Sequence, residues 1–212
     1  MLQRYTNLLL FGGQRRSGAS APPKVWRRIF HISAGSSIPI VGIFLSHDWM
    51  TAAMVVVAGG GLAIDLARFN LGWLNRQYMR WLAPLLKSDE SAHITGATYM
   101  VVAGLLLFLL YGKDVAVPAM LFLSLGDPAA AVVGSRLRGP RLGGKSPGGT
   151  LAFIAVGAGA TAVVVAAGGI DHHWALWVGA VVAGLVELAS IPPDDNFTIP
   201  LVAGTAMYLM GA

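Results

Sequence analysis

The sequence predicts an all-α fold, a polytopic bundle of about seven transmembrane helices, on three observations. Of its 212 residues, 55% are hydrophobic and only 12% are charged, about half the charged fraction of a typical soluble domain. The mean hydropathy is +0.65, and the apolar residues form runs close to the ~20 residues that cross a bilayer core. There is no cysteine, which excludes disulfides, thiolate catalysis and cysteine metal sites.

Seven apolar segments are predicted to be spans: residues 29–46, 51–67, 94–111, 115–134, 150–169, 174–190 and 197–212. Several are short or contain glycine, so one or two are expected to be tilted, broken or re-entrant. Residues 1–28 are interpreted as a basic cytoplasmic tail, because their LLLFGG stretch is too short for the apolar core of a secretory signal. Residues 29–212 then form a single membrane-embedded domain.

The basic residues predict which face each connection occupies. Of the 15 Lys and Arg residues, 14 lie in the tail and in the loops 68–93 and 135–149, and only Lys113 lies in the other connections. By the positive-inside rule, the N-terminus is cytoplasmic and the C-terminus lies on the opposite face.

Residues 72–87, GWLNRQYMRWLAPLLK, interleave arginines with aromatic and apolar residues. This pattern predicts an amphipathic helix that lies on the membrane surface. The net charge is +5, but the basic residues flank predicted spans, so they suit lipid headgroups better than a nucleic acid polymer.

Carboxylates border the apolar segments on the same face as the basic loops. A charged side chain in a span costs roughly 2.5–3.5 kcal/mol on insertion scales and usually marks a functional site. For Asp127 two interpretations stay open: a site carboxylate, or an ion pair with an arginine that only holds helices together. Pro128, directly after it, is expected to break or kink the span. The carboxylates are Asp65, Asp127, Glu187, Asp194 and Asp195.

The loop GPRLGGKS, residues 139–146, matches the letters of the phosphate-binding pattern G-x-x-x-x-G-K-[ST]. That pattern requires a strand before it, whereas here a predicted span lies on each side. The glycines still leave backbone N–H groups open to an anion, and Lys145 supplies a positive charge. The loop is either a phosphate-binding loop or a flexible basic turn.

Four stretches together resemble the polyprenol kinase family. They are GDPAAAVVGSRLRGPRLGGKSPGGT at 126–150, RRIFHISAG at 27–35, ITGATY at 94–99 and VELASIPPDDNFTIPLVAG at 186–204. This family contains dolichol kinases, phytol kinases and CTP-dependent diacylglycerol kinases, and it is more distantly related to phosphatidate cytidylyltransferases. The resemblance implies transfer of the γ-phosphoryl group of a nucleoside triphosphate, generally CTP, to a lipid hydroxyl at the membrane surface.

The resemblance assigns roles to residues that match the family's motifs. It places the nucleotide and the metal at the motif around Asp127 and Lys145. Arg28 stands where lysine is frequent, which keeps the charge but changes the hydrogen-bond geometry. The matched residues are Arg27, Arg28, Asp127, Gly134, Lys145, Ser146, Glu187, Asp195 and Asn196.

The predicted metal is Mg²⁺, which prefers one or two carboxylates together with phosphates and water. Asp127 is the first choice as its ligand, with Asp195 or Glu187 completing the site. The proton of the lipid hydroxyl goes to one of Asp127, Glu187 and Asp194, with base and ligand left open. The residues predicted to bind the nucleotide are Gly134, Arg136, Arg138, Gly143, Gly144, Lys145, Ser146 and Gly148.

Further residues are assigned less specific roles. Arg27 and Arg28 could stabilise the transferring group, and His31, on the same helix face, could bind phosphate or a carboxylate or could simply be packed. Thr95 could shape the lipid entry. The apolar walls of the bundle are expected to hold the lipid chain, with the active site facing the cytoplasm.

Two other functions remain open at this point. A phosphatidate cytidylyltransferase would also use CTP, Mg²⁺ and a lipid, but would release pyrophosphate. A transporter would explain carboxylates within spans as an ion path, although polar residues should then extend across the whole depth of the membrane.

Overall fold

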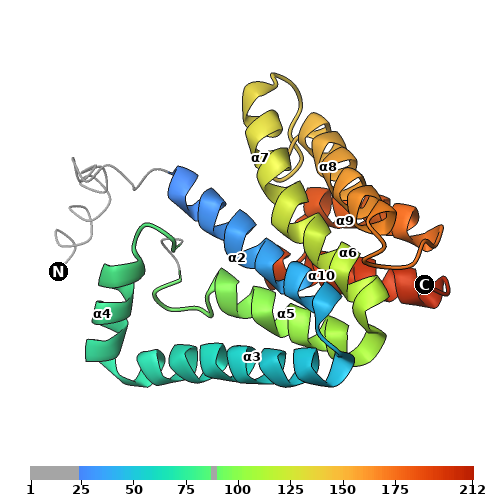
Figure 1. Ribbon diagram of the computed structural model, residues 1–212. Helices are drawn as coiled ribbons and strands as arrows, with labels where there is room; N and C mark the ends of the chain where they lie inside the picture. The colour runs from blue at the N-terminus through green and yellow to red at the C-terminus, as the bar shows by residue number, and fades with distance from the viewer. Residues whose placement is uncertain (1–23, 87–89) are drawn as a thin grey trace.

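The computed structural model describes residues 24–86 and 90–212, and within these ranges the chain is helical without a β-strand (Figure 1). The all-α prediction is confirmed for these residues. Positions 1–23 of the predicted tail lie outside them. The helices are α2 (Lys24–Phe44), α3 (His47–Asn70), α4 (Gly72–Leu82), α5 (Gly96–Tyr111), α6 (Lys113–Leu121), η1 (Phe122–Gly126), α7 (Asp127–Arg136), α8 (Pro147–Ala166), α9 (Ala175–Ala189) and α10 (Asp195–Leu209).

Each predicted span coincides with a helix or with a continuous run of helices. Three of them are long and apolar enough to cross a membrane: His47–Asn70, Lys113–Arg136 and Pro147–Ala166. α5 and α9 are apolar but have 16 and 15 residues, fewer than the ~20 that cross a bilayer core. The number of seven spans and the cytoplasmic N-terminus therefore stay predictions.

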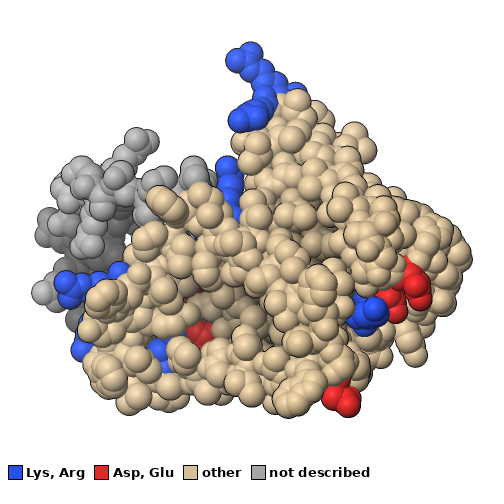
Figure 2. Space-filling view, viewed as in Figure 1, with Lys and Arg blue, Asp and Glu red and all other residues tan. Residues whose placement is uncertain are grey.

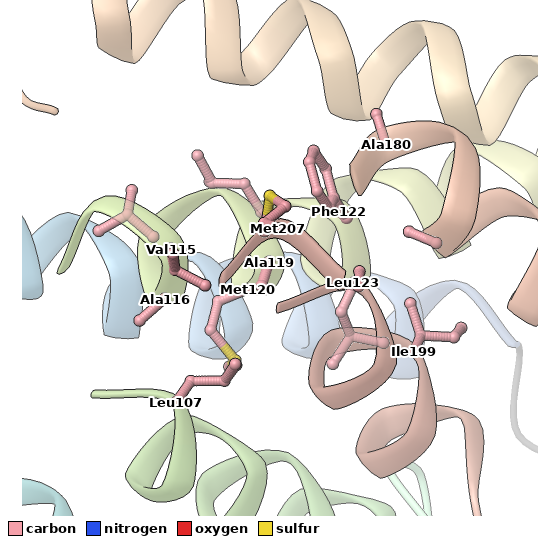
Figure 3. Close-up of a cluster of buried hydrophobic side chains, with 14 of the residues drawn as sticks. Leu107, Val115, Ala116, Ala119, Met120, Phe122, Leu123, Ala180, Ile199 and Met207 are labelled. Carbon is pink, nitrogen blue, oxygen red and sulfur yellow. The ribbon is translucent and has the colours of Figure 1, made fainter. Parts of the chain in front are cut away.

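The run α6–η1–α7 forms the centre of the bundle. Within its apolar window 72% of residues are buried inside the protein, compared with 22% in α3 and 28% in α8. Helices α2, α8 and α10 pack around it. Figure 3 shows Met120 and Phe122 of this run converging with Leu107 of α5 and Met207 of α10. α3 and α8 direct their apolar side chains outward, as lipid-facing helices do.

Pro128 lies within this central helix without breaking it. The helix continues from Lys113 to Arg136, and Phe122–Gly126 form a π-helical turn directly before Asp127. Proline has no N–H to donate, and its ring collides with the carbonyl group four residues earlier. The wider turn accommodates both effects. The expected break is thus a local widening, which places Asp127 at the start of α7.

A buried polar network joins α3 to the segment before α5. The Nε of Arg68, a fully buried side chain, donates to Asp65 Oδ1 at 2.6 Å, and its terminal nitrogens donate to Asn75 Oδ1 and to the carbonyl of His93. Asp65 Oδ2 accepts from the backbone N–H of Thr95 at 3.0 Å. Asp65 and Thr95 therefore hold α3 and α5 together at this end of the bundle.

The ends of the bundle differ in charge. An amphipathic helix was predicted over 72–87, whereas α4 ends at Leu82 and residues 83–86 form a turn and a bend. α4 turns away from α3 and runs across one end (Figure 1). Basic side chains gather toward this end and at the tip of α7, whereas acidic side chains predominate at the opposite end (Figure 2). The side chains between these two ends are mostly uncharged (Figure 2).

Candidate active site

A cavity of about 580 Å³ is lined by residues of α2, α4, α5 and α7, of the α7–α8 connection, and of α8 to α10. Its lining comes from two groups of elements. The segments α7 to α10 contribute mainly charged and small residues, and α2, α4 and the residues around the start of α5 contribute apolar side chains together with two arginines. A charged region and an apolar region therefore share one cavity.

Lys145 is the centre of the charged region. Its Nζ lies 2.8 Å from Glu187 Oε1, 3.0 Å from Asp195 Oδ2 and 3.9 Å from Asp127 Oδ1. These carboxylates come from the end of α9, the start of α10 and the start of α7. The structure thus brings together four residues that the sequence proposed for the site.

The loop that carries Lys145 is a tight turn. Leu142 and Lys145 exchange two backbone hydrogen bonds of 2.9 Å, and the two residues between them, Gly143 and Gly144, have φ of 55° and 90°. Both central positions need positive φ, which glycine adopts without strain. Arg141 donates to the carbonyl of Gly144, and so fastens the turn. The basic turn is therefore an ordered support for Lys145.

Helices α7 and α8 approach closely behind this turn. A Cβ at Gly149 would lie 2.9 Å from the carbonyl oxygen of Ala130, and one at Gly134 would lie 2.8 Å from Ser146 Oγ. Ser146 caps α8, since its Oγ accepts from the backbone N–H of Gly149 at 3.1 Å. The small residues in this motif set the distance between the two helices, which places Asp127 and Lys145 in one cavity.

The end of α9 and the start of α10 form the other wall of the charged region. Glu187 is only 2% exposed, and its second oxygen accepts from the hydroxyl of Thr150 at 3.1 Å. Asp194 caps α10, because its Oδ1 accepts from the backbone N–H of Asn196 at 2.9 Å. Asp195 then projects from the first turn of α10 toward Lys145.

One ammonium group stands against three carboxylates in this cluster. Burial alone would lower the pKa of Lys145, but the hydrogen bond to Glu187 and the charges of Asp195 and Asp127 raise it above its ordinary value. Burial also raises the pKa of Asp195, and Lys145 offsets only part of that increase, to which the nearby carboxylates of Asp127 and Asp194 add a little. The cluster therefore carries excess negative charge, which favours a further cation.

Helix α2 supplies positive charge to the same cavity. Arg27, Arg28 and His31 all line it. The Nε2 of His31 lies 3.3 Å from the carbonyl oxygen of Leu123, in the π-helical turn before Asp127. His31 therefore connects α2 to the central helix near the charged region.

Glu90 also lines the cavity, and sequence reasoning did not place it in the site. It is 6% exposed, and its Oε1 accepts from the backbone N–H of Gly96 at 2.8 Å. Hydropathy assigned it to a basic loop, where a carboxylate is unremarkable. Its position six residues before Gly96, in the ITGATY motif, was the signal that could have drawn attention to it.

Some predicted nucleotide-binding residues lie away from the cavity lining. Arg136 and Arg138 are exposed at the end of α7 and after it, and Gly143 faces open space. Gly148 packs against Leu137. Binding of the nucleotide by these residues stays a prediction that this arrangement does not support.

The predicted Mg²⁺ site is not preformed. Among the described residues no group of three His, Cys, Asp or Glu side chains is arranged to hold a metal ion. Asp127, Asp195 and Glu187 converge on Lys145 instead. Mg²⁺ commonly takes only one or two carboxylates and completes its shell with phosphate oxygens and water. The carboxylate oxygens and the excess negative charge of this cluster fit this way of binding Mg²⁺, in which the phosphates of the nucleotide supply the remaining ligands.

The chain is similar to two kinases named CTP-dependent diacylglycerol kinase 1. It is 28% identical over 212 residues to the one from Eremothecium gossypii, covering 87% of this chain and 66% of the relative. It is 24% identical over 161 residues to the one from Schizosaccharomyces pombe, covering 69% and 74%. An uncharacterized protein of Rickettsia prowazekii is 24% identical over 181 residues, covering 82% and 88%. No protein-family model matches the chain, and no solved structure does.

These similarities support a lipid-kinase type of family for the chain. Together with three apolar helices long enough to cross a bilayer, they indicate a membrane protein. The more distant relation to cytidylyltransferases stays a prediction.

Proposed function

We propose that this protein is a membrane lipid kinase that transfers the γ-phosphoryl group of CTP to the hydroxyl group of a lipid alcohol, with Mg²⁺ and with its site facing the cytoplasm. One observation carries the proposal. A single cavity joins the Lys145–carboxylate cluster to an apolar wall. A triphosphate and a lipid chain, which need opposite surroundings, can both be held there.

The charged region suits the nucleotide. Phosphoryl transfer requires positioning and charge neutralisation more than covalent chemistry. Lys145 would bind the triphosphate while Glu187 and Asp195 hold its ammonium group in place. Arg27 and Arg28, on the facing wall, would stabilise the charge on the transferring group.

Asp127 is the best candidate to hold Mg²⁺. Of the three carboxylates around Lys145 it makes the longest contact, and its side chain is 32% exposed, so it can turn toward a bound ion. When bound with the nucleotide, Mg²⁺ would neutralise charge on the phosphate oxygens. Asp195 would provide the second carboxylate.

The apolar region suits the lipid. Phe30 of α2, Leu82 of α4 and Met100 of α5 line the cavity, together with Leu85 and Leu86. These side chains would contact the hydrocarbon chain and leave its hydroxyl group at the boundary with the charged region. The acceptor is diacylglycerol, a polyprenol or a phytol-like alcohol.

Labelled CTP tests the proposal with purified protein in mixed micelles. Label on the γ-phosphate should appear in the lipid product, and label on the α-phosphate should not. Incorporation of the α-label alone, in parallel micelles that contain phosphatidate, would instead identify a cytidylyltransferase. No incorporation from either label, with any of the three alcohols or with phosphatidate, would contradict both enzymes and favour a transporter.

A further inference from the structure

Glu90 occupies a defined position in the cavity wall, and neither the charged cluster nor the apolar region accounts for it. Its carboxylate is 6% exposed. One oxygen accepts from the backbone N–H of Gly96, the first residue of α5, at 2.8 Å. A carboxylate buried to this degree at the edge of a ligand cavity is a candidate functional group.

Glu90 lies close to the charged cluster. A Cβ built on Gly96 would collide with the side-chain amide of Asn196 and would lie 3.3 Å from Glu90 Oε1. The side chains of Glu90 and Asn196 therefore both lie against the same face of Gly96. Asn196 directly follows Asp195, which contacts Lys145. Glu90 and the charged cluster therefore both lie near the start of α5 and the start of α10.

Glu90 also adjoins the apolar region. Leu85 and Leu86 precede it in the chain and line the same cavity, as do Tyr78 of α4 and Met100 of α5. Burial raises the pKa of the Tyr78 phenol, and the charges of Asp65 and, to a smaller extent, Glu90 add to that increase. Glu90 thus lies at the boundary where the hydroxyl group of a lipid acceptor would be placed.

The backbone that carries Glu90 is held rigidly from behind. Arg68 donates to the carbonyl of His93, and Asn75 donates to the carbonyl of Ser91 at 2.9 Å. Asp65 accepts from the N–H of Thr95. The buried network described above therefore fixes the segment between Glu90 and α5, which is the support that a reacting group requires.

The other buried carboxylate of the cavity belongs to the charged region. Glu187 is bound by both Lys145 and Thr150, and Asp195 is also bound by Lys145. Asp194 accepts from the backbone of α10 as its cap. These contacts place Glu187 and Asp195 beside the lysine proposed to bind the triphosphate, whereas Glu90 lies beside the apolar side chains that would hold the acceptor.

We propose that Glu90 is the general base for the lipid hydroxyl, an inference that rests on the proposed kinase function. The acceptor oxygen forms a bond to the γ-phosphorus as the bond from that phosphorus to the β–γ bridging oxygen breaks. The nucleoside diphosphate leaves with the electron pair, and the hydroxyl proton passes to Glu90. Glu90 then returns the proton to water when the products leave.

Glu90→Gln separates this role from a structural one. Glutamine keeps the side-chain oxygen that accepts from Gly96 but cannot take a proton. We expect kcat to fall about 100-fold or more, with the KM for CTP unchanged, because Lys145 and its carboxylates are untouched. Asp48→Asn, which neutralises an exposed carboxylate at the start of α3, controls for the loss of one negative charge and should retain wild-type kcat.

A second measurement varies the acidity of the acceptor. Fluorine beside the reacting carbon makes the hydroxyl group more acidic, so a base contributes less to the rate. The defect of Glu90→Gln should therefore shrink with the fluorinated acceptor, whereas misfolding or misplacement would reduce both rates equally. Wild-type kcat in Glu90→Gln, or an equal defect with both acceptors, would overturn the role of Glu90 alone. Absence of γ-phosphoryl transfer by the wild-type protein would overturn the proposed function, and this inference with it.

Discussion

Lys145 contacts carboxylates from three helices, and each of them constrains what the residue can do. Its Nζ lies within 4 Å of Glu187, Asp195 and Asp127. Such a lysine stays protonated, because these neighbours raise its pKa against the effect of burial. It is therefore suited to binding phosphate as a fixed cation and unsuited to acting as a base.

Replacing Lys145 with alanine should weaken nucleotide binding. A hydrogen bond to a charged partner contributes about 1.5–3 kcal/mol, so we expect the KM for CTP to rise about 10- to 100-fold. Steady-state kinetics with varied CTP measure this effect. Lys113→Ala, at the start of α6 with a contact to the carbonyl of Gly169, is the matched control and should be silent. An unchanged KM for CTP in Lys145→Ala would show that the loop is a structural turn that does not bind the nucleotide.

Asp127→Asn should abolish turnover while the protein still folds. Asparagine has nearly the same shape, and this side chain is partly exposed rather than buried, so the helix packing should survive. Loss of the proposed metal ligand should lower kcat about 100-fold or more. Transfer of the γ-label, measured beside the unfolding temperature in detergent, checks both parts. Full activity of Asp127→Asn would show that Asp127 has no role in the reaction.

At the scale of elements, the contact between α7 and α8 determines the site. Their backbones meet at Gly149 and Ala130, in the motif that connects Asp127 to Lys145. The same helix α8 also contains one glycine with open space around it. A Cβ at Gly159 would find no atom within 4 Å. Alanine at Gly149 therefore tests the packing of α8 against α7, whereas alanine at Gly159 changes only the helix propensity of α8.

Gly149→Ala should disrupt the site, and Gly159→Ala should not. At Gly149 the new methyl group would lie 2.9 Å from a backbone carbonyl, which cannot move without separating α7 from α8. We expect a lower unfolding temperature and weaker CTP-dependent stabilisation. At Gly159 alanine meets no atom and gains up to about 1 kcal/mol of helix propensity. Thermal unfolding with and without CTP distinguishes the two, and equal effects would contradict this account of the packing.

At the scale of the whole molecule, the segregation of charge predicts the orientation in the membrane. The described charged groups collect at two ends, with mainly uncharged side chains between them (Figure 2). The cavity opens at the end with α4 and the α7–α8 loop, the face that the positive-inside rule assigns to the cytoplasm. A site on that face would have direct access to cytoplasmic nucleotides.

Labelling of single cysteines tests this orientation, because the chain has no cysteine of its own. Gly139→Cys places a thiol in the α7–α8 loop, where the surrounding space is open. His172→Cys places one in the exposed connection before α9. A membrane-impermeant maleimide should label the first only in inverted vesicles and the second only in intact cells. Labelling of both from one side would contradict the crossing of α8.

The sequence predicted well those features that depend on neighbouring residues. These features are the helical segments, the amphipathic stretch now seen as α4 and the concentration of basic residues in particular loops. Each of them can be recognised from residues that are close together in the chain. Pro128 shows the limit of such reasoning. The local rule predicts a break, whereas a π-helical turn absorbs the proline within a helix that its neighbours cover on most sides.

It was harder to predict from the sequence alone which residues line the site. Arg136 and Arg138 lie beside the loop in sequence but are exposed and do not line the cavity, whereas Glu90 lines it from a segment that hydropathy treated as a loop. The sequence also gave no means to separate Asp65, which is held by Arg68 in a buried structural pair, from the carboxylates that face Lys145.

The amino-acid sequence by itself determined that this is an apolar, helical protein whose basic residues are concentrated in its tail and in two connections, because hydropathy and the positions of charges along the chain do not depend on how the helices pack. Only the tertiary structure decided which of those groups meet. Lys145 and Asp195 are separated by 50 residues, and their contact depends on how α8, α9 and α10 pack. Long-range packing follows from the fit of whole helix faces, and no short pattern in the chain encodes it.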